Sequence, residues 1–164
     1  MSVSFVDTPS PSPSRGREGS LAAPSRGREG SLAAPSRGRE GSLRFQGYAA
    51  VFDRVDRAGD VFRRGVFADA VPVPLLVRHR GGAVGEMLAI GEDHRGLWIE
   101  ALVSDPEIAR LVRCGALGGL SVGYRALAVQ QGAWRAVLRA ALVEVSLVAV
   151  PMQAAARVAA VFEI

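Results

Sequence analysis

A serine, a histidine and a glutamate are the residues of this sequence best suited to chemistry. Ser121 stands in Gly119-Leu-Ser-Val-Gly123, which matches the G-x-S-x-G pattern of a nucleophile elbow. Such glycines let the backbone turn sharply and expose the serine oxygen beside N–H groups, here those of Val122 and Gly123, that can stabilise an oxyanion. The alternative is a strand serine whose hydroxyl bonds the backbone. Cys114 is a weaker nucleophile candidate, because it ends an apolar helical segment with no acid–base neighbour in sequence.

The chain has two histidines, His79 and His94. His79 ends the apolar run 74–79, where a strand is expected to meet a loop, and strand ends are where a rigid scaffold presents side chains to a cleft. His94 lies in the charged turn 92–95 and is most simply a solvated loop residue. His79 is therefore the better general-base candidate, although a lone histidine in such a place is more often structural.

Chain order limits the class of hydrolase. An α/β-hydrolase runs serine, acid, histidine, and no histidine follows Ser121. The order of chymotrypsin could be written as His79, Asp93 and Ser121, but a chain of 164 residues is too short for two barrels. What remains is a histidine before a serine on some other fold.

Glu144 is a carboxylate within the apolar segment 142–150, where burial is costly unless the group is paired or hydrogen-bonded. Strand alternation puts Leu142, Glu144 and Ser146 on one face. This face either meets solvent or an arginine, or else Glu144 accepts the second imidazole N–H and stabilises the imidazolium formed when the serine attacks. Both interpretations stay open at this point.

Composition favours one packed domain. Hydrophobic residues make up 49% of the chain, and a single cysteine excludes an internal disulfide framework or a Cys-rich zinc site. The longest charge-free run, Val145–Ala156, is far shorter than the roughly 18–20 apolar residues of a membrane span. The N-terminus has no basic region followed by an apolar stretch, so we expect no secretory signal and a cytoplasmic protein without a membrane partner.

All 20 basic residues are arginine, and the net charge is +4. The charge is shared equally, because residues 1–43 carry six arginines and four acids and residues 44–164 carry fourteen and twelve. Neither part is strongly basic, which argues against nucleic acid as a partner.

Residues 13–43 form an internal repeat. The segment PSRGREGSLAA occupies 13–23, recurs identically at 24–34 and recurs without its two alanines at 35–43. Each unit holds one proline, two glycines and a single leucine, so a packed helix is not expected. We expect residues 1–43 to be a disordered Pro/Arg/Gly/Ser tail, the alternative being an Arg-Gly segment that touches nucleic acid or an acidic partner.

Residues 44–164 read as a single domain, mainly β with helices (α+β). The pattern predicts about six strands, one short amphipathic piece and one clear helix, which suggests a small barrel or sandwich with a helix on its side. The strands are expected at 44–52, 74–79, 83–91, 96–103, 120–130 and 133–150, the amphipathic piece at 61–71 and the helix at 104–115.

Several stretches together resemble the tailed-phage prohead (procapsid maturation) serine proteases, of which related versions occur in the gene transfer agents of bacteria. They follow the order of that family and cover about residues 44–156. They are Gly47–Asp53 with Gly59-Asp60 and Gly65–Phe67, then Leu75–His79, Gly96-Leu97, Gly119–Tyr124, and Leu142–Val148 followed by Pro151.

The resemblance implies a fold similar to the herpesvirus assembly proteases, a small β-barrel flanked by helices. It implies a serine endopeptidase that cleaves capsid or scaffold protein inside the procapsid in the host cell, without metal or cofactor. By motif match, Ser121 is the nucleophile and His79 the base. Glu144 is the candidate third member, and His94 is a minor rival because herpesvirus relatives use a second histidine. Arg80 departs from the small acid or amide that often follows the family's histidine.

A different class of function is also compatible with the sequence. A non-catalytic β-barrel module could serve head assembly or contact nucleic acid through its arginines. The oligomeric state, including a homo-oligomer, stays open.

Overall fold

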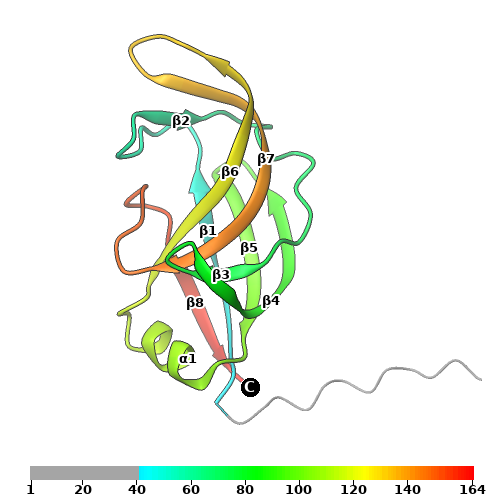
Figure 1. The fold of residues 1–164 in the computed structure, drawn as a ribbon, viewed down its shortest axis with the longest axis vertical. Helices are drawn as coiled ribbons and strands as arrows, with labels where there is room; N and C mark the ends of the chain where they lie inside the picture. Colours follow the sequence, from blue (N-terminus) through cyan, green and yellow to red (C-terminus); the bar gives the residue numbers. More distant parts are fainter. Residues whose placement is uncertain (1–40) are drawn as a thin grey trace, which may run out of the picture. The chain divides into compact units, whose positions relative to one another are not determined.

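Residues 41–164 are the part of the chain described by the structure, a computed structural model (Figure 1). The expected tail, residues 1–43, lies almost wholly outside this part. The first strand begins at Leu43, next to the boundary that the composition suggests.

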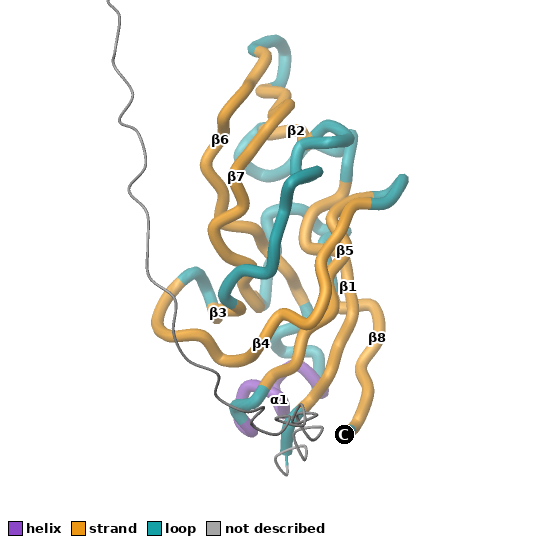
Figure 2. The backbone as a smooth tube through the Cα atoms, turned by 90° about the vertical axis from the view of Figure 1, so that its right-hand side faces the viewer, coloured by secondary structure: helices purple, strands orange, loops and turns teal. Residues whose placement is uncertain are grey.

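One eight-stranded sheet makes up most of this part of the chain, with the strand order β2-β7-β3-β4-β5-β1-β8 and with β6 paired to β7. In the view turned by 90°, the β6–β7 hairpin lies on one side of the molecule and β5, β1 and β8 lie on the other (Figure 2). β3 and β4 curve between these two groups of strands (Figure 2). The elements are β1 (Leu43–Val51), β2 (Asp60–Phe62), β3 (Leu75–Val77), β4 (Arg80–Glu92), β5 (Gly96–Val103), α1 (Pro106–Arg113), β6 (Gly119–Gln130), β7 (Arg135–Val148) and β8 (Val158–Glu163).

The predicted hairpin of residues 83–103 is confirmed as β4 and β5, which pair in antiparallel register. Its turn is closed by Asp93, whose carboxylate accepts hydrogen bonds from the backbone N–H groups of Arg95 and Gly96. A short side chain that bonds the backbone two and three residues ahead is a common way to fix such a turn.

The predicted helix is also confirmed, as α1. Asp105 caps its start by accepting hydrogen bonds from the N–H groups of Glu107 and Ile108, and Pro106 occupies the first turn, where its missing N–H costs nothing. The helix ends at Arg113, Cys114 is its C-terminal cap, and Gly115 follows with a φ of +78°, a left-handed conformation that favours glycine. Among residues 41–164 no helix is long and apolar enough to span a membrane.

The expected closed barrel with flanking helices is not what the strand pairing forms. β7 has β6 on one edge and the short strands β2 and β3 on the other, so the free edge strands of the sheet are β6 and β8. The described residues contain only one helix. The gap between β6 and β8 is bridged at one point, where Leu120 N–H donates to the carbonyl of Ala156 at 2.9 Å and Val158 N–H to that of Gly118 at 3.0 Å. Beyond this point β8 pairs along β1 instead of β6, so the sheet curves strongly without closing.

Two strands, β2 and β8, are not predicted by the sequence pattern. The piece 61–71, expected to be amphipathic, begins as β2, which pairs in parallel with β7, and continues as turns. β8 has apolar residues on both faces and therefore lacks the alternation that marks a half-buried strand. Both segments pair with strands far away in sequence.

The core fills the space inside the curved sheet. Its largest fully buried side chains come from β1, β3, β5, β6 and β7 and from the turn after β2, and include Phe45, Phe67, Leu75, Leu97, Ile99, Leu120 and Leu147. The outer part of the β6–β7 hairpin extends beyond this core (Figure 1), and there Leu127, Trp134 and Leu138 are exposed.

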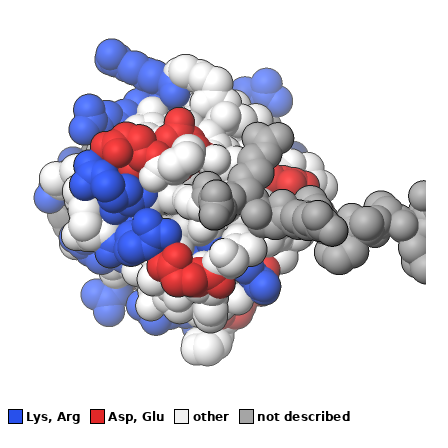
Figure 3. All heavy atoms as spheres, turned by 90° about the horizontal axis from the view of Figure 1, so that it is seen from below, with Lys and Arg blue, Asp and Glu red and all other residues white. Residues whose placement is uncertain are grey.

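The surface charges are mixed. On the face seen from below, arginines and acids are interspersed (Figure 3). Five arginines of the described part form ion pairs, which are Arg44–Glu100, Arg63–Asp53, Arg110–Glu107, Arg113–Glu163 and Arg135–Asp60.

Candidate active site

Three residues singled out in the sequence meet at one place. Nε2 of His79 lies 3.1 Å from Oγ of Ser121, and Nδ1 of His79 lies 2.5 Å from Oε1 of Glu144. The serine belongs to β6, the glutamate to β7 and the histidine to the turn between β3 and β4. The imidazole therefore bridges a hydroxyl and a carboxylate that come from neighbouring strands.

The register of β6 and β7 places the hydroxyl and the carboxylate. Ser121 pairs with Ser146, and Gly123 pairs with Glu144. A Cβ atom at Gly123 would collide with Oε1 of Glu144, so only glycine leaves room for the carboxylate to reach the histidine. Of the two interpretations of the G-x-S-x-G pattern, the strand serine is the one observed, but its hydroxyl bonds His79 and not the backbone. Gly123 serves close packing rather than a sharp turn.

His79 lies in the two-residue turn of the β3–β4 hairpin. Val77 pairs with Arg80, and the two residues between them, Arg78 and His79, have φ angles of 52° and 59°. Left-handed backbone at both central positions is typical of a type I′ turn, which usually contains Asn-Gly. For larger residues this conformation is strained and persists only where surrounding contacts hold it.

Two hydrogen bonds to β7 hold this turn. The N–H of Arg78 donates to the carbonyl of Leu147 at 3.0 Å. The N–H of His79 donates to Oγ of Ser146 at 2.9 Å. The strand that carries the glutamate therefore also fixes the backbone of the histidine.

Glu144 is buried, with 8% of its surface exposed. Both of its oxygens have partners, because Oε1 meets the histidine and Oε2 accepts a hydrogen bond of 2.8 Å from the hydroxyl of Ser146. Of the two interpretations that the sequence left open, the contact with the histidine is the one observed. Within residues 41–164, Glu144 forms no ion pair with an arginine.

The other candidates lie elsewhere. His94 is exposed in the β4–β5 turn, where it lines a surface hollow with Arg54 and Arg64. Cys114 is exposed at the end of α1. Neither residue bonds the histidine, serine or glutamate described above. In this part of the chain no three His, Cys, Asp or Glu side chains are grouped as metal ligands.

The two backbone N–H groups expected to stabilise an oxyanion point in opposite directions. Leu120 N–H donates away from β7, to Ala156. Successive N–H groups of a strand alternate between its two edges, so that of Val122 also points away from β7 and that of Gly123 points toward β7. Val122 alone therefore offers an N–H on the free edge of β6.

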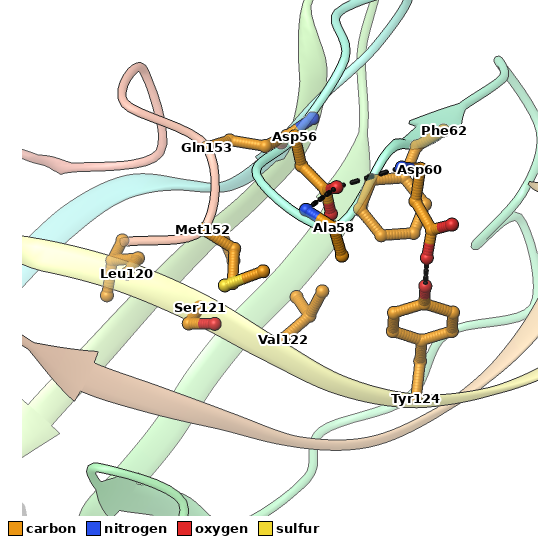
Figure 4. Close-up of a pocket in the computed structure, with 11 residues that line it drawn as sticks. Asp56, Ala58, Asp60, Phe62, Leu120, Ser121, Val122, Tyr124, Met152 and Gln153 are labelled. Atoms are coloured by element: carbon orange, nitrogen blue, oxygen red, sulfur yellow. Dashed lines mark hydrogen bonds between the residues drawn. The ribbon is translucent and has the colours of Figure 1, made fainter. Parts of the chain in front are cut away.

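A pocket of about 110 Å³ lies beside Ser121 (Figure 4). Its walls are largely apolar, and its polar end carries Asp60 and Tyr124, whose hydroxyl donates to the Asp60 carboxylate. Ala49, Asp56, Ala58, Phe62, Leu120, Val122, Met152 and Gln153 complete the lining.

Arg135 completes the cluster at the polar end. Its guanidinium donates two hydrogen bonds to Asp60, of 2.6 and 2.5 Å. These bonds and the Tyr124 hydroxyl hold the pKa of Asp60 below its usual value. Burial, followed by the neighbouring carboxylate, raises the pKa of Tyr124 to about 12. At neutral pH the cluster therefore holds an aspartate, a charged arginine and a neutral tyrosine.

Comparison with known proteins gives relatives in sequence and in fold. Residues 31–163 match the model of the family described as caudovirus prohead serine protease. The prohead protease of Enterobacteria phage HK97 is 27% identical over 92 residues, which are 49% of this chain and 41% of that protein. The chain thus spans less than half the length of this relative.

The fold is similar to that of a herpesvirus enzyme. The structure of the Kaposi's sarcoma-associated herpesvirus protease in complex with a hexapeptide phosphonate inhibitor matches with a TM-score of 0.53 and 16% identity, over 75% of this chain and 66% of that chain. This likeness concerns the fold, whereas the family match concerns the sequence and covers most of the chain. The chain belongs to the caudovirus prohead serine protease family.

Proposed function

We propose that this protein is a serine endopeptidase that cleaves capsid or scaffold protein during procapsid maturation. The observation that carries the proposal is the hydrogen-bonded series from Ser121 through His79 to Glu144, with distances of 3.1 and 2.5 Å, in a chain of the prohead protease family. A hydroxyl, an imidazole and a carboxylate in this order are the parts that acyl transfer requires.

In the proposed reaction, Oγ of Ser121 attacks the carbonyl carbon of the scissile peptide while Nε2 of His79 takes the hydroxyl proton. The C–N bond then breaks, and the imidazolium returns the proton to the leaving amine. A water molecule, deprotonated by the same histidine, then attacks the acyl-serine ester, and as the ester C–O bond breaks the imidazolium returns this proton to Oγ of Ser121 and the acid is released. Glu144 accepts the Nδ1–H throughout, which fixes the tautomer and stabilises the imidazolium.

The oxyanion of the tetrahedral intermediate needs donors on the open side of the serine. The N–H of Val122 has the required direction, whereas that of Gly123 faces β7. Loss of one such donor costs about 3 kcal/mol of transition-state stabilisation in well-studied hydrolases. We therefore expect the backbone N–H of Val122, and not that of Gly123, to donate to the oxyanion.

The pocket beside Ser121 supplies a place for a substrate side chain next to the scissile bond. Its walls are largely apolar, and the carboxylate of Asp60 is already bonded to Arg135 and Tyr124. We therefore expect this pocket to prefer a small or medium apolar side chain. The substrate would be the major capsid protein or the scaffold of a phage or gene transfer agent particle, cleaved inside the procapsid within the host cell.

Co-expression with the major capsid protein tests this function. The unchanged chain should shorten the capsid protein, and Ser121→Ala should leave it at full length while the fold persists. A fluorophosphonate probe, which labels activated serines, should react with the unchanged protein and fail with Ser121→Ala and His79→Ala. Absence of labelling, together with DNA binding that falls steeply with salt, would favour the non-catalytic module instead.

A further inference from the structure

Ser146 is a fully buried serine that touches two parts of the candidate site at once. Its side chain has 0% of its surface exposed. The hydroxyl donates to Oε2 of Glu144 at 2.8 Å and accepts from the backbone N–H of His79 at 2.9 Å. One hydroxyl therefore joins the carboxylate to the main chain of the base.

The contact with His79 matters because of the backbone there. Arg78 and His79 both have left-handed φ angles, a conformation that is uncommon for residues other than glycine. The hydroxyl provides an acceptor for an N–H that this unusual turn directs toward β7. Without that acceptor, the bond from Arg78 to Leu147 would be the only one of the two bonds to β7 that remains.

The contact with Glu144 fixes the plane of the carboxylate. The terminal torsion of a glutamate has broad minima, so a carboxylate held through one oxygen can rotate. Here Oε1 meets the imidazole and Oε2 meets the hydroxyl, so both oxygens are fixed. The orientation of the imidazole depends on this carboxylate.

We propose that Ser146 is a positioning residue that holds the imidazole of His79 and the carboxylate of Glu144 in the relative orientation that proton transfer requires. The proposal rests on the proposed function for its effect on rate, but its structural part concerns only the imidazole and can be measured separately. Ser146 is the cross-strand partner of Ser121, but its hydroxyl bonds His79 and Glu144 and it does not line the pocket, so we infer that it acts through those two residues. We therefore expect it to affect kcat and to leave KM nearly unchanged.

Two substitutions and one control separate positioning from packing. Ser146→Ala removes the hydroxyl and should lower kcat about 10- to 100-fold, with KM within about twofold. Ser146→Thr keeps the hydroxyl and should restore most of the rate. Val137→Ala weakens the same strand at a buried position outside the site, and should retain kcat despite lower stability.

The second measurement is the low-field proton NMR resonance of the His79 Nδ1–H bonded to Glu144. We expect it in the unchanged protein, in Ser146→Thr and in Val137→Ala, and we expect it to be lost in Ser146→Ala. If Ser146→Ala does not fold, Ser146→Cys keeps the size with a weaker donor and should give an intermediate rate and a weakened resonance.

The outcomes distinguish this proposal from the proposed function. A Ser146→Ala protein that keeps both the resonance and kcat within about twofold would overturn the positioning role, as would an equal loss of kcat in Val137→Ala. An unchanged protein that shows the resonance but is not labelled by a fluorophosphonate would contradict the protease function. Loss of the resonance in Ser146→Ala would, even then, support Ser146 as the group that positions the imidazole.

Discussion

Two buried carboxylates, Glu144 and Asp60, lie near the β6–β7 hairpin and have opposite surroundings. Glu144 is bonded to an imidazole and a hydroxyl, whereas Asp60 is bonded to the guanidinium of Arg135 and the hydroxyl of Tyr124. Both are almost fully buried, with 8% and 5% of their surfaces exposed. The difference lies in the partner, since a guanidinium only donates hydrogen bonds, whereas an imidazole can both accept a proton and pass it on.

This difference separates a structural role from a chemical one. The cluster around Asp60 links β2 to β7 and forms one end of the pocket beside Ser121. The cluster around Glu144 ends at the serine hydroxyl, through a histidine whose side chain is 44% exposed. A carboxylate with a permanently charged partner stabilises the fold, and a carboxylate behind an accessible imidazole can support proton transfer.

The largest expected effect is on the rate, at Glu144. Glu144→Gln should lower kcat about 10³- to 10⁴-fold, because an amide no longer stabilises the imidazolium or fixes its tautomer. Rates of fluorophosphonate labelling and of capsid-protein cleavage would measure this. Glu100→Gln makes the same chemical change on β5, away from the site, and should leave both rates unchanged. Equal rates for Glu144→Gln and the unchanged protein would mean that the two carboxylates do not differ in the way proposed.

Asp60→Asn should instead affect stability. Asp60 is buried but the Arg135 side chain is 42% exposed, so water can solvate the guanidinium when its partner is lost, and we expect a loss of about 1–2 kcal/mol in the free energy of unfolding. Urea unfolding would measure it, and the folded fraction should still be labelled by the fluorophosphonate. Asp53→Asn breaks an exposed pair with Arg63 and should cost less than about 1 kcal/mol. Similar losses in the two variants would contradict a structural role for Asp60.

The same pair makes a prediction about acid pH. The pKa of Asp60 is lowered in the folded state, so its contribution to stability is present above the ordinary aspartate value of 3.8 and is lost as the pH falls through the lower folded value. The difference in unfolding free energy between the unchanged protein and Asp60→Asn should therefore stay constant from neutral pH to about 5 and shrink below 3.8. A difference that grows in acid would contradict the assigned partners.

Sequence analysis could predict the members of the site better than their geometry. Ser121 could be identified from its glycine-flanked motif, and Glu144 from the energetic cost of placing a carboxylate in an apolar strand. The left-handed turn at His79 could not be predicted, because the sequence Arg-His is not one of the pairs, such as Asn-Gly, that typically form this turn. The turn is held by Ser146, 67 positions further along the chain. Ser146 could be placed on the face of Glu144, but its two bonds depend on that distant turn.

The fold shows the same limit. The β4–β5 hairpin and α1 depend on local signals, namely alternation, a turn aspartate and a helix cap, and they were predicted. β2 has three residues and pairs with β7 across more than seventy positions, and β8 lacks alternation. Whether the sheet closes depends on where β8 leaves β6 for β1, which is set by tertiary packing rather than by any local pattern.

The smallest expected effect is at Tyr124, which bonds Asp60 from the β6 side. Tyr124→Phe keeps the ring that packs edge-on against Phe62, with 5.0 Å between the ring centroids, and removes only the hydroxyl. Asp60 retains its two bonds from Arg135, so we expect a loss of about 1 kcal/mol in the free energy of unfolding. The rate of fluorophosphonate labelling should not change, because the hydroxyl of Ser121 lies at the other end of the pocket.

Alkaline titration tests the same bond independently. The folded pKa of Tyr124 is raised to about 12 from the usual 10.0, so the stability due to its neutral hydroxyl is complete below pH 10 and is lost as the pH rises through about 12. Ultraviolet absorbance of phenolate should show a tyrosine that ionises near pH 12 in the unchanged protein and is missing from Tyr124→Phe. In Asp60→Asn this ionisation should move to lower pH, because the carboxylate that disfavours the phenolate is gone. An unchanged titration in Asp60→Asn would mean that burial alone raises the pKa of Tyr124. The hydrogen bond from its hydroxyl to Asp60 would then contribute nothing to the cluster around Asp60.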